Sequence, residues 1–216
     1  IEPDEVHVFV YDYNADIIEE RQMKNTEECF PYKNSNRNSW INVDGLRKVD
    51  VESISNHYGI HLLIQEDILS VGQRPKMDEV EGVLFCILNM LYFNEQKKTV
   101  ETEQISLVLG PDYVISFQED ASRDVFDPLR HKLKTPKSQI RQRSADYLLV
   151  MEKLGEQIEA VEEEVVRSSN KRSLAKINQL KKEMIVLKRN IAPVRDLVNG
   201  IIRSESDLLN ERTTKY

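Results

Sequence analysis

Apolar and polar residues follow two different periods along the chain, and the change comes near residue 150. Before it, short apolar runs lie between clusters of turn-forming residues, which is typical of strands and short helices. After it, apolar residues recur every three or four positions, as in Leu154, Ile158, Val161 and Val165. That spacing places them on one face of a helix. The pattern therefore predicts a body over residues 1–150 and a helical segment over 151–216.

The body contains six runs that predict strands and four that predict helices. The strands are expected at residues 6–13, 17–23, 40–43, 83–93, 103–109 and 113–118, with turns at Asn14–Asp16 and Gly110–Asp112. A helix capped by Asp50 or Ser53 is expected to run to Tyr58 and to end at Gly59. Further helices are predicted at 62–70, 124–134 and 138–149. Asp124 is the expected cap of the helix at 124–134.

The C-terminal segment predicts two long helices joined by a tight turn at Ser168–Asn170. The second carries apolar residues from Leu174 to Val198, with Pro193 inside the pattern, where it should kink the helix. The predicted fold is therefore α+β: a mixed β-sheet sandwiched by helices (α/β/α), followed by a long antiparallel helical hairpin. A solitary hairpin of this length needs a neighbour to cover its apolar face, so self-association is expected.

Composition removes several classes of function. The seven glycines are well separated, with Gly72 and Gly82 the closest pair, so the glycine-rich loops of common nucleotide-binding sites are absent. The longest apolar run, Val83–Leu88, is too short to span a membrane. Residues 1–150 carry 17 Lys and Arg against 26 Asp and Glu, a formal charge of −9, and residues 151–216 carry 13 against 11. An acidic body argues against nucleic acid and is compatible with cations.

The two cysteines, Cys29 and Cys86, lie far apart in sequence and form no metal-binding or redox motif. This usage is typical of a reducing compartment. The chain begins at Ile1 without a signal peptide, and we expect it to be a fragment of a longer protein.

Acidic pairs are the strongest candidates for chemistry. Glu66 and Asp67 interrupt an otherwise apolar stretch, and neighbouring carboxylates on a helix could reach a cation at an edge or interface. From the residues alone, an exposed polar face is the favoured explanation for this pair, as it is for Glu162–Glu164. His57 and His61 have helical spacing, but Gly59 lies between them and no third ligand is evident, which favours helix-end histidines over a zinc pair. We find no nucleophile and base arrangement, so no enzymatic activity is expected.

Several stretches, in order, resemble the CorA family of magnesium transporters. The most specific combination is EDILSVGQRPK (66–76), DVFDPLRHKLK (124–134) and IAPVRDLVNGIIR (191–203). Further matches are WINVDGL (40–46), TEQISLVLGPDYVISFQE (102–119), IRQRSADYLL (140–149) and EKLGEQIEAVEEEVV (152–166).

The resemblance implies the cytosolic domain of a homopentameric Mg²⁺ or Co²⁺ channel, on the cytoplasmic side of the plasma membrane. Glu66 and Asp67 match carboxylates that help to bind regulatory Mg²⁺ between subunits, together with an aspartate of the neighbouring subunit's stalk helix. The family's mechanism is negative feedback, in which high internal Mg²⁺ holds the pentamer closed. Residues 151–216 would lead to stalk and membrane helices that this chain lacks, along with the Gly-Met-Asn pore motif.

Two details depart from the family pattern. The stalk aspartate is expected beyond Tyr216, and a family segment of about a dozen residues is missing at Val150–Met151. Three other interpretations stay open: a zinc-transporting member of the same family, a soluble oligomeric scaffold without transport, and a metal-dependent hydrolase.

Overall fold

The computed structural model describes residues 5–94, 99–120 and 126–136. It also describes Pro3, Ser138 and positions near the C-terminal end: Ile185, Arg189, residues 193–197, residues 199–201, Arg203 and Leu208. Among these residues, no helix combines the length and the apolar character that crossing a bilayer requires.

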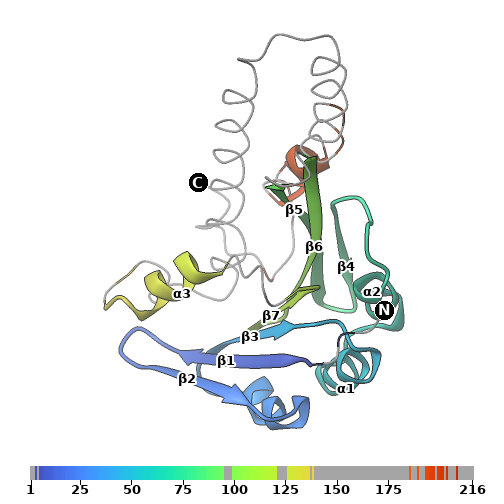
Figure 1. The fold of residues 1–216 in the computed structure, drawn as a ribbon. Helices are drawn as coiled ribbons and strands as arrows, with labels where there is room; N and C mark the ends of the chain where they lie inside the picture. Colours follow the sequence, from blue (N-terminus) through green and yellow to red (C-terminus); the bar gives the residue numbers. More distant parts are fainter. Residues whose placement is uncertain are drawn as a thin grey trace.

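A seven-stranded mixed sheet forms the centre of the fold (Figure 1). Its strands follow the order β2-β1-β3-β7-β6-β5-β4. Only the β3–β7 pair is parallel, and every other neighbouring pair is antiparallel. The bounds are β1 His7–Tyr13, β2 Ile18–Met23, β3 Asn38–Asp44, β4 Lys76–Val80, β5 Val83–Asn94, β6 Thr99–Leu109 and β7 Tyr113–Gln118.

The central strands β3 and β7 are covered on both faces, and their polar side chains bond to one another. Trp40 Nε1 donates to Ser116 Oγ at 2.9 Å, and Ser116 Oγ donates to Asn42 Oδ1 at 2.7 Å. Asn42 Nδ2 and Gln118 Nε2 both donate to Asp44 Oδ1 at 2.8 Å. Buried polar groups need such partners, so this network helps to hold the parallel pair of this sheet in register.

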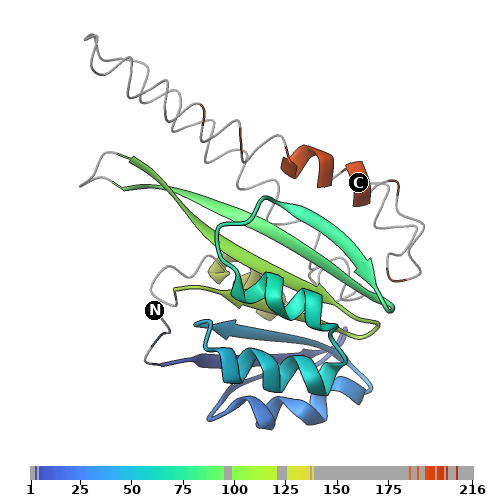
Figure 2. The ribbon, with the colours of Figure 1, turned by 90° about the vertical axis from the view of Figure 1, so that its right-hand side faces the viewer.

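Helices cover both faces of the sheet (Figures 1 and 2). On one face lie α1 (Lys48–Tyr58), α2 (Leu62–Leu69) and the 3₁₀ segment η1 (Thr26–Asn34). They share one apolar core with the sheet. On the other face α3 (Asp127–Lys134) contributes Leu129 and Leu133 to a second core, which also holds Leu197 and Ile201 of the C-terminal region. The predicted α+β sandwich of helices and mixed sheet is confirmed.

All six predicted strands are present. The predicted turn at Asn14–Asp16 lies between β1 and β2, and the one at Gly110–Asp112 lies between β6 and β7. Gly59 ends α1 in the left-handed conformation at φ 74°, as its position after the helix predicted. Cys29 and Cys86 are both buried and unpaired.

Other details of the prediction were wrong. Strand β4 and segment η1 were missed, because β4 is a charged edge strand and η1 contains Pro31 and no helical periodicity. Helix α1 begins at Lys48, so Asp50 and Ser53 lie inside it, and Asp50 pairs with Arg47 instead of capping the helix.

Helix α3 begins at Asp127 with Phe126 at its cap position, where Asp124 had been predicted. The predicted helix at 138–149, the first hairpin helix and Glu162–Glu164 lie outside the described residues, apart from Ser138. Residues 193–197 are helical, as the second hairpin helix predicted.

Candidate functional site

Helix α2 carries the two predicted metal ligands, and its local sequence explains its position. His61 caps the helix, with Nδ1 accepting from the Leu63 amide at 3.2 Å. Ile64 and Ile68, one turn apart, are buried against the sheet. Gln65 Nε2 donates to the Ile60 carbonyl at 2.8 Å, which ties the helix to the end of α1. The buried face of α2 therefore fixes the direction in which Glu66 and Asp67 point.

Glu66 and Asp67 are neighbours in sequence but lie in different surroundings. The Glu66 side chain is exposed to solvent, whereas the Asp67 side chain is 24% exposed and turned toward the segment that leads into β4. Successive residues on a helix point about 100° apart, which separates the two carboxylates. Leu62 and Leu63, one turn before Glu66, are exposed at 67% and 61%. Glu66 thus shares the exposed side of α2 with two leucines.

The Asp67 carboxylate already has two partners within the chain. Lys76 Nζ lies 2.5 Å from Asp67 Oδ2, and Gln73 Nε2 donates to Asp67 Oδ1 at 2.8 Å. Lys76 Nζ also lies 3.6 Å from Asp78 Oδ2. The carboxylate is thus neutralised by an ammonium group that is itself only partly buried.

A hydrogen-bond network below Asp67 holds this end of α2 against the sheet. Gln104, buried in β6, donates from Nε2 to the Asp67 carbonyl at 3.2 Å and accepts from the Gln73 amide at 3.1 Å. Asn89 Nδ2 of β5 donates to the Gln73 carbonyl at 3.0 Å. These bonds fix both the helix end and the loop that follows, so the position of the Asp67 carboxylate is set by two strands.

The sequence prediction named Glu66 and Asp67 but missed Lys76, Gln73 and Gln104. The signal was present in part, because Gln73 and Lys76 belong to the GQRPK segment directly after the acidic pair. Gln104 is far away in sequence and reaches Asp67 only through the pairing of β6 with β5 and β7.

His57 and His61 serve structural roles at helix ends. The His57 ring lies flat against Phe30, with 3.9 Å between ring centroids, and its Nε2 is 3.1 Å from the Phe30 carbonyl oxygen. His61 is occupied as the α2 cap. The described residues thus give these histidines the helix-end positions that the sequence favoured.

The described residues alone provide limited ligands for a metal ion. No three His, Cys, Asp or Glu side chains within them gather closely enough to form a cage. Mg²⁺ usually keeps several waters and takes one or two carboxylates, so Glu66 and Asp67 fit its minimum requirement. Asp67 is already paired with Lys76, so a cation at this carboxylate would compete with the ammonium group.

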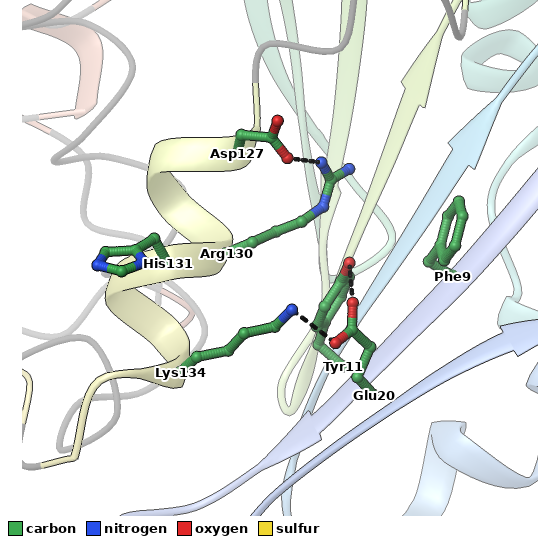
Figure 3. A pocket seen from close by; sticks show the side chains of 7 residues that line it. All are labelled: Phe9, Tyr11, Glu20, Asp127, Arg130, His131 and Lys134. Carbon is green, nitrogen blue, oxygen red and sulfur yellow. Dashed lines mark hydrogen bonds and ion pairs between the residues drawn. The ribbon is translucent and has the colours of Figure 1, made fainter.

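A pocket of about 500 Å³ lies between α3 and the β1–β2 hairpin (Figure 3). Its charges are paired: Arg130 with Asp127 at 2.9 Å, and Lys134 with Glu20 at 2.6 Å. Burial alone raises the pKa of the Glu20 carboxyl, but hydrogen bonds from Lys134 and Tyr11, together with the positive charges of Lys134 and Arg130, hold this pKa below its ordinary value. The Lys134–Glu20 pair joins α3 to β2, whereas the Arg130–Asp127 pair lies within α3.

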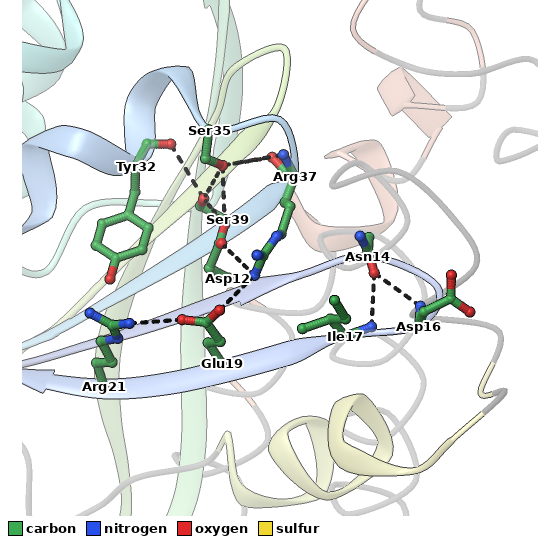
Figure 4. Close-up of polar contacts among 10 residues, drawn as sticks. All are labelled: Asp12, Asn14, Asp16, Ile17, Glu19, Arg21, Tyr32, Ser35, Arg37 and Ser39. Atoms are coloured by element: carbon green, nitrogen blue, oxygen red, sulfur yellow. Dashed lines mark hydrogen bonds and ion pairs between the residues drawn. The ribbon is translucent and has the colours of Figure 1, made fainter.

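A second polar cluster surrounds Asp12 in β1 (Figure 4). Asp12 Oδ1 accepts from Ser39 Oγ at 2.9 Å and from Ser35 Oγ at 3.0 Å, and Arg37 Nη1 lies 3.2 Å from Asp12 Oδ2. Arg37 also pairs with Glu19 at 3.0 Å, and its hydrogen bond lowers the pKa of the Glu19 carboxyl. This cluster ties the turn after η1 to the first two strands.

The comparisons with known proteins agree with one another. The family model described as CorA-like Mg²⁺ transporter protein matches residues 35–216. A curated relative, the cobalt/magnesium transport protein CorA of Thermotoga maritima, is 31% identical over 227 aligned residues, which cover 99% of this chain and 64% of the relative. The chain therefore spans less than two thirds of that relative's length.

Two solved structures share the fold. The cytoplasmic domain of ZntB from Vibrio parahaemolyticus has a TM-score of 0.68 at 17% identity, covering 97% of this chain and 85% of that one. The soluble domain of CorA from Methanocaldococcus jannaschii has a TM-score of 0.63 at 16% identity, covering 100% and 86%.

Proposed function

This chain belongs to the family of CorA-like Mg²⁺ transporter proteins, and on that premise we propose that it is the cytosolic, cation-sensing part of a Mg²⁺ or Co²⁺ channel. The observation that carries the proposal is the placement of Glu66 and Asp67 on a helix whose position is fixed by the sheet. Both residues lie inside the segment that the family model matches.

The chemistry of the site supports a weakly bound divalent cation. A Mg²⁺ ion bound there would supply two positive charges that bridge acidic surfaces. Glu66 and Asp67 would contribute the carboxylates, and the remaining protein ligand would be the stalk aspartate of a neighbouring subunit. Weak binding suits a sensor, because its occupancy then changes near the ambient ion concentration.

The surroundings of Glu66 favour contact with a second copy. Leu62 and Leu63 are exposed beside this carboxylate, and exposed apolar residues next to a charged site are typical of an interface. The body has a formal charge of −9, so copies packed through this face would repel one another without a cation. We propose that cation loss loosens a homopentamer and thereby opens the pore, which gives negative feedback on uptake.

The remaining parts of the proposal follow from the family. We propose that residues 1–150 are the body and that residues 151–216 are a helical hairpin leading toward the membrane from its cytoplasmic side. The chain binds cations without catalysing a reaction, and it binds no nucleic acid. The principal alternative is zinc transport, which the likeness to the ZntB cytoplasmic domain supports at the level of the fold.

The test compares thermal unfolding and oligomeric mass of the 216-residue chain in Mg²⁺, Co²⁺, Zn²⁺, Ca²⁺ and chelator. At ten times the dissociation constant, Mg²⁺ should raise the melting temperature by roughly 3–5 °C. Asp67→Ala should abolish this rise. Asp16→Ala, which removes one charge from an exposed turn, is the matched control and should keep it.

Equal Mg²⁺ responses of the wild type and Asp67→Ala would contradict the proposed site. A response to Zn²⁺ at lower concentration than to Mg²⁺ or Co²⁺, lost in the same variant, would favour the zinc alternative.

A further inference from the structure

Lys76, the first residue of the edge strand β4, lies between two carboxylates, that of Asp67 in α2 and that of Asp78 in β4. Its ammonium group is 2.5 Å from Asp67 Oδ2 and 3.6 Å from Asp78 Oδ2. The side chains of Asp67, Lys76 and Asp78 are 24%, 35% and 52% exposed, so exposure increases from the helix outward. Lys76 therefore has a second acceptor, Asp78, which is more exposed to solvent than Asp67.

The two members of the Asp67–Lys76 pair differ in how firmly they are held. Asp67 is anchored by the Gln73 side chain and by the bond from Gln104 to its carbonyl. Lys76 projects from the outermost strand of the sheet on a four-carbon stem with rotatable bonds. When the pair separates, the lysine side chain is the partner that can move, and the carboxylate stays in place.

The pair does little for folding stability by itself. Partly exposed ion pairs contribute about 0–1 kcal/mol, because water screens them and the long side chain loses freedom. Its position has a clearer consequence for ion binding. An ammonium group in contact with Asp67 repels any second cation that approaches the same carboxylate.

We propose that Lys76 is a built-in competitor for Asp67, which a divalent cation must displace and which thereby sets the concentration at which the site fills. This inference rests on the function proposed above. In the cation-free protein, Lys76 neutralises Asp67. On cation binding, Lys76 withdraws toward Asp78, which keeps the ammonium paired. The Asp67 carboxylate is thus paired with Lys76 in the cation-free protein and with the divalent cation in the bound protein.

The test measures the Mg²⁺ concentration that gives half of the thermal shift, with binding heat from calorimetry as a second readout. Lys76→Met removes the competitor and keeps an unbranched stem, so half-saturation should come at a Mg²⁺ concentration about three to five times lower. Lys76→Arg keeps the charge and should stay close to the wild type.

The matched control for the lost charge is Lys48→Met. Lys48 is an exposed lysine of α1 that pairs with Glu52 at 3.6 Å, so its removal changes the net charge equally but leaves Asp67 untouched. Lys48→Met should change half-saturation less than Lys76→Met does.

Asp78, the second acceptor, allows a test in which half-saturation is expected to move in the opposite direction. Asp78→Asn takes away the group that receives the displaced ammonium, so half-saturation should move to higher Mg²⁺. Glu79→Gln, an exposed neighbour on the same strand, removes the same charge and should have a smaller effect.

The outcomes separate the two proposals. If the wild type responds to Mg²⁺ through Asp67 but Lys76→Met responds at the same or a higher concentration, the competitor role is overturned and the sensing role stands. If neither the wild type nor Lys76→Met shows an Asp67-dependent response, both proposals fail.

Discussion

Asp12 and Asp67 are both aspartates paired with a basic side chain, and they lie toward opposite edges of the sheet. The Asp12 side chain is 9% exposed and is enclosed by Ser35, Ser39 and Arg37. The Asp67 side chain is 24% exposed and meets Lys76 and Gln73. The same residue type is thus placed in two surroundings that differ in burial and in the number of donors.

The difference lies in whether the positive partner can leave. Arg37 is held by two carboxylates, those of Asp12 and Glu19, and it lies against two paired strands. Lys76 has an exposed second acceptor and starts an edge strand. A carboxylate whose partner is fixed serves folding, whereas one whose partner can withdraw is available to an external cation.

The largest expected effect on stability comes from Asp12→Ala. It removes the acceptor of two hydroxyls and leaves the Arg37 charge partly buried with one partner fewer, so unfolding should become easier by about 3 kcal/mol. Asp67→Ala is the matched variant and should lower stability by less than about 1 kcal/mol in chelator. Urea unfolding of both variants checks this, and equal losses would remove the distinction between the two sites.

An intermediate effect is expected from Gln104→Leu. The leucine leaves the Gln73 amide without its acceptor and takes one donor from the Asp67 carbonyl, which should lower stability by about 1–2 kcal/mol. Because the helix end then loses its anchor, the Mg²⁺-dependent thermal shift should also shrink. Gln22→Leu, at an exposed position of β2, is the control and should change neither quantity. An unaltered Mg²⁺ response in Gln104→Leu would show that this anchoring does not matter to the site.

The smallest expected effect is the loss of stability at low pH that comes from Glu20 in the pocket beside α3. The folded-state pKa of Glu20 lies below the ordinary value of 4.5, so its ion pair stabilises the fold above that pH. The stabilisation is lost as pH falls through the lower folded-state pKa. Glu20 is 40% exposed, so the loss should stay below about 0.5 kcal/mol.

The corresponding measurement is the stability of Glu20→Gln between pH 3 and pH 6. This variant should show a shallower decline than the wild type, and Glu27→Gln, at the exposed start of η1, should not. Parallel declines in wild type and Glu20→Gln would mean that Lys134 does not hold α3 through this carboxylate.

Much of the fold could be predicted from local patterns. Strand β5 is an apolar run too long for a loop, and β1 is a β-rich run bounded by an Asn-Ala-Asp turn. Gly59 marked the end of α1 because few other residues adopt a positive φ without strain. Strand β4 escaped prediction because its charged residues are stable only as an edge beside β5.

The candidate site could be predicted only in part. The acidic pair stood out because two carboxylates interrupt an apolar helix, and the resemblance gave them a role. The contrast between an exposed Glu66 and a paired Asp67 could not be predicted, because it depends on the rotation of α2 about its axis. That rotation follows from the burial of Ile64 and Ile68 against the sheet.

The sequence by itself determined six of the seven strands, the acidic balance of the body and the pair of carboxylates, because these depend on residue type and spacing alone. Only the tertiary structure decided that Lys76 faces Asp67 and that Gln104 supports it, since those partners meet through strand pairing across the sheet. Charge pairing over such separations is set by packing, and packing is what gave Asp12 and Asp67 their different surroundings.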